Sequence, residues 1–300
     1  MNINNKYFCN KCKRKFIFEN DRYICKNCKK IIPIEANIPR FVETDIYAGN
    51  FSFQWNIHKR TQFDDKVHKI SEDTFFRRFG LEKEFFHNKD VLEVGVGNGR
   101  YAEIPLKYGS NLYGIDLSSS VDSAYSNLKP KYKSLNIAQA DLQDLPFEDC
   151  TFDVIYAFGV LHHTPDPELS FNKLVPLLKK DGVICITVYP EYGMYKNSLI
   201  VRKITNNLHP YILYPIILIL VLILYIPYKY LLLRHTFLGK IFPIGINDSI
   251  FEAILVTYDC YSPKYQFCYA AHEIFSWYKK AGLSNIEVRP DPTTLIGYKK

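Results

Sequence analysis

The residues best suited to hold a small charged ligand lie in one stretch, 91–100, which reads VLEVGVGNGR. Its apolar start is typical of a buried strand, and the strand ends where glycines begin. Three glycines alternate there: Gly95, Gly97 and Gly99. Because glycine lacks a Cβ, a ligand can approach the backbone amides closely. Glu93, just before the turn, carries a negative charge that suits an ammonium group better than a pyrophosphate.

A second apolar run ends at Ile115 and Asp116, sixteen residues after the glycine turn. A carboxylate at the end of a strand can accept two hydrogen bonds from a ribose diol. The third glycine comes one place earlier than in a dinucleotide fingerprint, and Arg100 stands where the helix-packing glycine is expected. The pattern therefore disfavours NAD and predicts an adenosyl-type cofactor that carries an ammonium group.

Glu-x-Gly-x-Gly-x-Gly followed by an aspartate at a strand end resembles class I S-adenosylmethionine-dependent methyltransferases of the type 11 group. Further segments resemble later motifs of that superfamily in the same order: Ala140–Leu142, Leu145–Phe147, Phe152–Tyr156, Gly159–His163 and Leu178–Val188. The resemblance implies S-adenosylmethionine as cofactor, with Asp141 at the adenine amino group and the turn around Gly97 at the methionine part. Leu142, in the first of these segments, and Phe158, just before Gly159, complete the expected cofactor site.

Four of the eight cysteines form two CxxC pairs separated by twelve residues: Cys9, Cys12, Cys25 and Cys28. Two such pairs can bring four thiolates to one Zn²⁺, so we expect a closed structural zinc site in a Trm112-like ribbon over residues 1–42. A redox pair or an iron–sulfur centre is the alternative. The basic residues between and around the pairs favour zinc, because they offset the charge of a zinc–thiolate centre.

The rest of the chain predicts an α/β fold, a Rossmann-like, doubly wound, seven-stranded methyltransferase sheet. We expect a helical lead-in over 43–88, the cofactor-binding core over 89–190, a hydrophobic and basic helical insert over 191–250, and completion of the sheet over 251–300. Three hundred residues suit one large domain and a small one, and the net charge of +7 is modest for this length. The polar start resembles no signal peptide, so we expect a cytoplasmic protein, with a peripheral place on the inner membrane face as an option.

The insert contains an apolar stretch, 211–233, that is long enough as a helix to cross a bilayer. A single crossing would separate strands of one sheet, and Pro215 and Pro227 are expected to confine the uninterrupted apolar core to 216–226, which suits an interfacial or re-entrant element better than a span. Basic residues flank it: Lys196, Arg202, Lys203, Lys229, Arg234 and Lys240. This pattern favours contact with an anionic membrane surface; a buried cap over the active site or a dimer interface are the alternatives.

Methyl transfer from a sulfonium depends mainly on alignment, but a hydroxyl acceptor needs a base. His162 and His163 are the catalytic candidates because they follow the fourth strand of the core, and His272, Asp259 and Tyr189 are weaker ones. We expect a methyltransferase acting on an amphipathic small molecule or a lipid-linked glycan. An RNA methyltransferase that docks its substrate through the ribbon, and a non-catalytic protein-binding module, are the alternatives.

Overall fold

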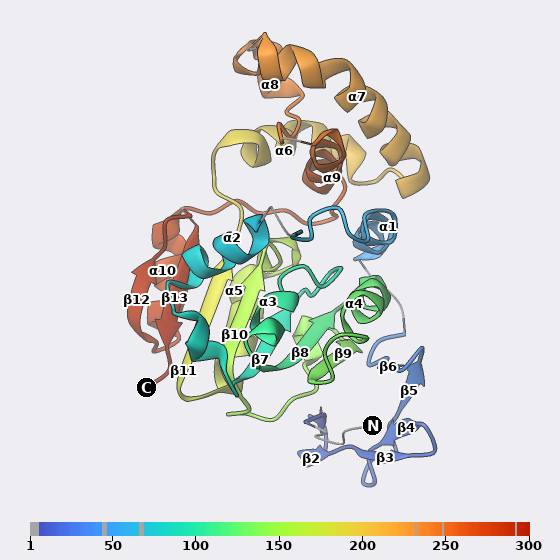
Figure 1. Ribbon diagram of the computed structural model, residues 1–300, viewed down its shortest axis with the longest axis vertical. Helices are drawn as coiled ribbons and strands as arrows, with labels where there is room; N and C mark the ends of the chain where they lie inside the picture. Colours follow the sequence, from blue (N-terminus) through green and yellow to red (C-terminus); the bar gives the residue numbers. More distant parts are fainter. Residues whose placement is uncertain (1–5, 44–46, 66–68, 232, 248, 292) are drawn as a thin grey trace.

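A seven-stranded sheet forms the centre of the computed structural model, which describes residues 6–43, 47–65, 69–231, 233–247, 249–291 and 293–300. Its strand order is β12-β13-β11-β10-β7-β8-β9, and β13 alone runs against its neighbours (Figure 1). The strands are β7 (Asp90–Val94), β8 (Asn111–Asp116), β9 (Leu135–Gln139), β10 (Phe152–Phe158), β11 (Leu178–Thr187), β12 (Ser284–Val288) and β13 (Thr294–Tyr298). The predicted seven-stranded, Rossmann-like sheet is confirmed.

Helices cover both faces of the sheet because its strands are apolar on both sides. Neighbouring residues of β10 divide between two cores: Ile155 joins one apolar cluster, whereas Val154 and Tyr156 join the other. The flanking helices are α2 (Ile70–Phe79), α3 (Glu103–Lys107), α4 (Ser120–Leu128), α5 (Pro167–Leu174) and α10 (Ala271–Lys280). Short 3-10 turns connect them: η1 (Lys83–Phe86), η2 (Leu142–Asp144), η3 (Leu161–His163) and η4 (Val175–Leu177).

The N-terminal segment forms short antiparallel strands that pack on the main domain. They are β1 (Phe8–Cys9), β2 (Arg14–Lys15), β3 (Ile17–Glu19), β4 (Arg22–Ile24), β5 (Ile31–Glu35) and β6 (Ile38–Pro39). The Phe8 amide donates to the Pro146 carbonyl at 2.8 Å. Tyr7, Phe16 and Ile32 belong to the same apolar cluster as the sheet. The ribbon is therefore part of the main core rather than a separate head.

A layer of helices covers the carboxyl ends of the strands, at the end of the molecule opposite the ribbon (Figure 1). It consists of α1 (Gly49–Ile57), α6 (Gly193–Thr205), α7 (Pro210–Tyr230), η5 (Leu233–His235), α8 (Phe237–Ile241) and α9 (Ile250–Tyr261). Helix α9 packs on α6 and α7, so the layer continues past residue 250, where the sequence placed its end.

Two expectations for the insert are wrong. Helix α7 runs without a break through Pro215 and Pro227, each of which removes one backbone hydrogen bond from it. Arg202 is buried rather than available at the surface, and its guanidinium donates to the Cys260 carbonyl at 3.2 Å. Thr187 of β11 is paired with Thr294 of β13, so the chain leaves and re-enters the sheet on either side of the insert. A single membrane crossing by α7 is therefore excluded by topology.

Candidate active site

A cavity of about 420 Å³ opens at the carboxyl ends of β7, β8, β10 and β11. Strand β7 lies between β8 and β10, so the strand order changes direction at β7: the chain continues to β8 on one side and later returns to β10 on the other. Such a point in an open α/β sheet is where ligands bind, because the loops diverge there. The cavity is lined by the glycine turn, Asp116, the loop after β10 and residues of α1, α6 and α9.

Gly95 and Gly97 form the floor of the cavity and require glycine for different reasons. Gly95 has φ +73°, and a Cβ there would lie 2.2 Å from a methyl group of Val160. Gly97 has φ +52°, and a Cβ there would lie 3.2 Å from Trp55 Nε1. Gly99 is not among the lining residues; a Cβ there would lie 2.7 Å from Leu128 of α4. Gly99 therefore takes the helix-packing role that sequence reasoning assigned to position 100.

Asp116 lies in the cavity wall, at the end of β8, as the sequence predicted. Its carboxylate accepts hydrogen bonds from the Gly97 amide at 2.9 Å and from the Ser118 hydroxyl at 2.7 Å. Burial raises the pKa of Asp116, whereas these donors lower it. The bonds fix the carboxylate beside the glycine turn. Its hydrogen bonds to a ribose stay a prediction.

Glu93 is buried in the cavity wall with an unsatisfied oxygen. Glu93 Oε2 makes no hydrogen bond of ordinary geometry to the described residues. Burial raises the pKa of this carboxyl well above its ordinary value, although the neighbouring Tyr156 hydroxyl lowers it. A buried acceptor without a partner is costly, and an ammonium group would supply both a donor and a compensating charge. The residues present therefore fit the methionine part of S-adenosylmethionine.

Of the remaining predicted cofactor residues, two line the cavity and one does not. Leu142 and Phe158 line the cavity, and the Arg78 guanidinium lies 4.9 Å from the centre of the Phe158 ring. Asp141 does not line the cavity; its carboxylate accepts from the Gln143 amide at 2.9 Å and caps η2. A bond from Asp141 to an adenine amino group stays a prediction.

The two catalytic candidates have different surroundings although they are adjacent. His163 lines the cavity, and its Nδ1 is 2.9 Å from the Tyr265 carbonyl, which fixes Nδ1 as the donor. His163 Nε2 is left as an acceptor without a partner among the described residues. His162 is fully buried behind the wall, its ring 3.8 Å from that of Tyr189. Burial lowers the pKa of both imidazoles, that of His162 more strongly. Of the two histidines, His163 alone lines the cavity.

The far wall of the cavity consists of residues that sequence reasoning missed or ranked low. Tyr195 of α6 stacks on Tyr189 with ring centres 3.6 Å apart. The Tyr189 hydroxyl donates to the carboxylate of Asp259, which α9 positions. Helix α9 also contributes Leu255 and Val256. The third histidine candidate, His272, is exposed on α10 and does not line the cavity.

Helix α1 covers the cofactor end of the cavity. It contributes Phe51, Gln54 and Trp55, and Tyr47 lies just before it. The predicted lead-in helix, α2, instead packs Phe75 and Phe79 on the sheet and contributes Arg78 to the cavity. The density of aromatic residues in 47–55 was the one sequence signal for a cover, and no spacing marked it as functional.

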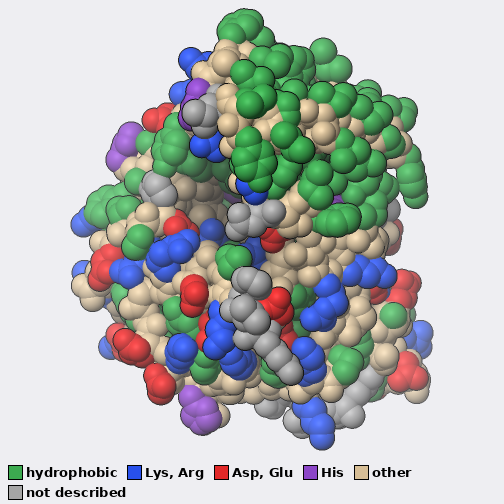
Figure 2. Space-filling model, turned by 45° about the horizontal axis from the view of Figure 1, so that its top comes forward, with side chains coloured by type: hydrophobic (Ala, Val, Ile, Leu, Met, Phe, Trp, Pro, Cys, Tyr) green, Lys and Arg blue, Asp and Glu red, His purple; other side chains and the backbone are tan. Residues whose placement is uncertain are grey.

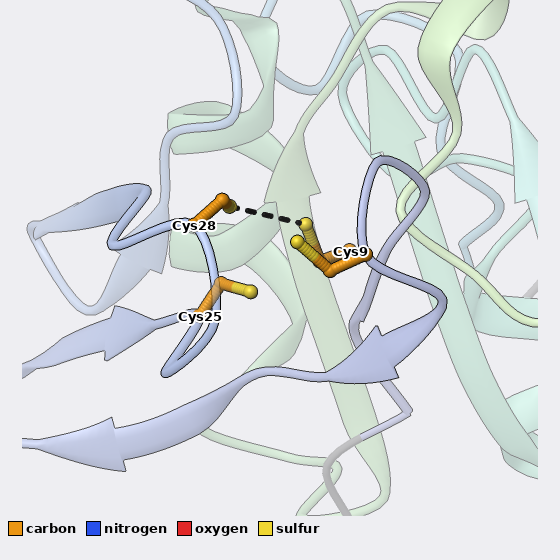
Figure 3. A group of neighbouring side chains, drawn as sticks. Cys9, Cys25 and Cys28 are labelled. Carbon is orange, nitrogen blue, oxygen red and sulfur yellow. Dashed lines mark hydrogen bonds between the residues drawn. The ribbon is translucent and has the colours of Figure 1, made fainter.

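The four predicted zinc ligands converge in the N-terminal ribbon, at the end of the molecule opposite the helical layer (Figure 1). Figure 3 shows Cys9, Cys25 and Cys28 of this group beside one another. The sulfur atoms of Cys9, Cys12, Cys25 and Cys28 all lie within 4.8 Å of one another. The Cys9 and Cys28 sulfurs are 3.7 Å apart. Zinc–sulfur bonds of about 2.3 Å in a tetrahedron place the sulfurs about 3.8 Å apart. The backbone amide of Cys28 lowers the pKa of Cys25 to about 6, whereas burial raises the pKa of Cys9 to about 12. The cluster thus fits the predicted structural zinc.

Known proteins resemble the central part of the chain. A methyltransferase-domain family matches residues 92–186. Ubiquinone biosynthesis O-methyltransferase of Coxiella burnetii is 28% identical over 124 residues, which are 41% of this chain and 53% of that protein. Phosphoethanolamine N-methyltransferase 2 of Caenorhabditis elegans is 29% identical over 158 residues, 51% of this chain and 34% of that protein. The chain thus spans about half, or less, of the length of these curated relatives.

A tRNA U34 carboxymethyltransferase of Nautilia profundicola is 32% identical over 128 residues, 40% of this chain and 43% of that protein. Among solved structures, magnesium protoporphyrin IX methyltransferase of Synechocystis is 13% identical with a TM-score of 0.50. The match covers 85% of this chain and 98% of that one and shows a shared fold. Residues 92–186 thus match a methyltransferase domain, and the chain shares its fold with a solved methyltransferase.

Proposed function

We propose that the protein transfers a methyl group from S-adenosylmethionine to an amphipathic small molecule that enters the cavity beside His163. One observation carries this proposal: a single cavity joins the glycine turn and Asp116 to a wall of Tyr189, Tyr195 and Leu255. The first part offers charged and backbone groups for the cofactor. The second part is mainly aromatic and aliphatic, with few polar groups to orient a ligand, as in sites for apolar small molecules.

S-adenosylmethionine supplies, when bound, a methyl group on a sulfonium. Glu93 holds the ammonium end and Asp116 the ribose, while Gly95 and Gly97 leave room for the backbone to approach the ligand. Trp55 of α1 lines this end of the cavity. The chain thereby contributes alignment, which is the larger part of catalysis for an in-line displacement.

His163 can take up the proton that a hydroxyl acceptor loses as its oxygen gains the methyl group. Its Nδ1 proton is held by the Tyr265 carbonyl, so Nε2 presents a lone pair. Burial lowers the pKa of His163, which keeps the ring neutral at pH 7 and able to accept the proton. The bond between Tyr189 and Asp259 fixes the ring of Tyr189 as a rigid wall of the acceptor site.

The experiment is transfer of label from methyl-labelled S-adenosylmethionine to a cell extract, followed by separation into organic-soluble, aqueous, protein and RNA pools. We expect label in the organic-soluble pool and a rate at least about 100-fold lower with His163→Gln. Label in RNA alone would favour the RNA methyltransferase alternative, for which the tRNA-modifying relative gives a precedent. Cofactor binding without label in any pool would favour a non-catalytic role.

A further inference from the structure

Helix α7 has two apolar faces, and only one of them is covered. Leu213, Ile217 and Val221 recur every four residues and are buried in a cluster with residues of α9. The opposite face is equally apolar but open to solvent, with Ile219 58% and Ile223 64% exposed. An amphipathic helix of a monomeric soluble protein has a polar outer face. The outer face of α7 therefore lacks a partner in this chain.

The uncovered apolar surface extends beyond α7. Ile204 of α6 and Phe237 of α8 are 71% and 78% exposed. Figure 2 shows that hydrophobic side chains cover most of the upper part of the molecule, where α7 and α8 lie. We call this area the insert surface; it comprises Ile200, Ile204, Tyr211, Ile212, Ile216, Ile219, Leu222, Ile223, Ile226, Tyr230, Leu231, Phe237 and Leu238. Continuous exposed apolar areas of this kind mark sites of contact with a protein or a membrane.

Charge distinguishes between these partners. No Asp or Glu occurs between Glu191 and Asp248. Four exposed basic residues accompany the insert surface: Lys196, Lys203, Arg234 and Lys240. None of the four has an acidic partner in the part of the chain that the structure describes. A second copy docked on this face would bring two sets of unpaired cations together, whereas anionic lipid headgroups would compensate them.

The ends of α7 also match a bilayer interface. Tyr211 and Tyr230 stand at its two ends, 73% and 68% exposed. Tyrosine prefers the headgroup region, where its ring is buried and its hydroxyl stays in contact with water. A helix of 21 residues is about 31 Å long, enough to span, but β11 and β13 keep both ends of the insert on one side. The geometry therefore requires a helix that lies in the interface.

We propose that the insert surface docks the protein on an anionic lipid bilayer, with α7 parallel to the membrane plane and its outer face among the acyl chains. The covered face of α7 rests on α9, whose Leu255 and Val256 line the cavity. The membrane thus lies one helix away from the acceptor wall. Docking stands apart from methyl transfer, since it needs no cofactor and can be measured without catalysis.

The test is flotation of the full-length protein with vesicles of phosphatidylcholine containing phosphatidylglycerol, because bound protein floats and aggregated protein sediments. We expect binding that exceeds binding to pure phosphatidylcholine at least tenfold and that decreases as salt screens the basic residues. Ile219→Asp with Ile223→Asp should reduce binding at least tenfold without changing the melting temperature, since both side chains are exposed.

Leu169→Asp with Val288→Asp is the matched control, because it replaces two exposed apolar side chains outside the insert by the same charges. It should bind like the wild type. Wild-type protein that stays unbound at low salt, or an Ile219/Ile223 variant that binds like the control, would refute the proposal. A dimer in sedimentation velocity that the same variant dissociates, without vesicle binding, would assign the insert surface to a second copy instead.

Discussion

Replacing Glu93 by Gln should weaken S-adenosylmethionine binding by about 10- to 150-fold. The substitution keeps the shape of the side chain but removes the charge next to the expected ammonium. Glu93 Oε2 is buried and makes no hydrogen bond of ordinary geometry to the described residues, so an ammonium would make its hydrogen bond there without competition from water. Hydrogen bonds to charged groups contribute about 1.5–3 kcal/mol, and about 1.4 kcal/mol corresponds to a factor of ten. Titration calorimetry measures the change.

Proton linkage provides a second readout at the same residue. Burial raises the pKa of Glu93 well above its ordinary 4.5. An ammonium favours the carboxylate, so binding should release a proton at pH values between the ordinary pKa and the raised one. The heat of binding should then depend on the ionisation heat of the buffer, and Glu93→Gln should abolish that dependence. In the empty protein the stability of the wild type should fall, relative to the variant, as pH rises through this window.

Adenosine, which lacks the methionine part, is the control ligand and should bind the wild type and Glu93→Gln equally. A folded variant that binds S-adenosylmethionine as tightly as the wild type would remove Glu93 from the ammonium site. Proton release that persists in the variant would assign the linkage to another buried group, of which Asp116 is the nearest candidate because its pKa is also raised by burial.

Three further predictions concern the metal, the base and the cover. One zinc per chain should copurify, and Cys25→Ser should release it. Because Tyr7 and Phe16 of the ribbon join the main core, the same variant should lower the melting temperature of the whole chain, by about 2–4 °C per kcal/mol of stability lost. Cys150→Ser, which replaces an exposed cysteine, should change neither the zinc content nor the melting temperature. Metal analysis without zinc, or an iron–sulfur absorbance, would contradict this. His163→Gln should lower kcat at least about 100-fold. In the wild type, kcat/KM should fall at pH values below 6.5, where His163 becomes protonated, because burial lowers the pKa of His163. The variant should lose this fall, and a fall that persists would exclude His163 as the base. Cofactor binding should change the fluorescence of Trp55, which lines the cavity, but not that of Trp277, which is buried in the core. The fluorescence change should therefore persist in Trp277→Phe and vanish in Trp55→Phe. The reverse result would place Trp55 outside the site.

The predictable features of this protein depend on local chemistry. Strand β7 and its turn could be read from Val91–Gly97 because apolar runs, glycines with positive φ and a strand-end carboxylate act over a few residues. The two CxxC pairs are similarly local, and the four sulfurs converge as their spacing predicts. The resemblance predicted that 251–300 would complete the sheet, and β13 of that segment pairs with β11 although the two strands are more than a hundred residues apart.

The features that escaped prediction depend on contacts between distant segments. His162 and His163 are indistinguishable in sequence, and only the packing of η3 turns one ring into the cavity and the other into the core. Asp259 meets Tyr189 because α9 crosses the end of β11, a contact that no local pattern encodes. The prolines of α7 misled for a related reason: the contacts of the helix with α9 outweigh two missing hydrogen bonds.

The pairing of β11 with β13 also has a consequence for synthesis of the chain. Thr187 and Thr294 are 107 residues apart, a stretch that a ribosome translating about 5–20 residues per second needs roughly 5–20 s to make. During that interval the edge of β11 is unpaired and α7 has already emerged with both apolar faces uncovered, because α9 follows it. The nascent chain is therefore most prone to aggregation before α9 has covered α7, and the edge of β11 stays exposed until β13 has been made.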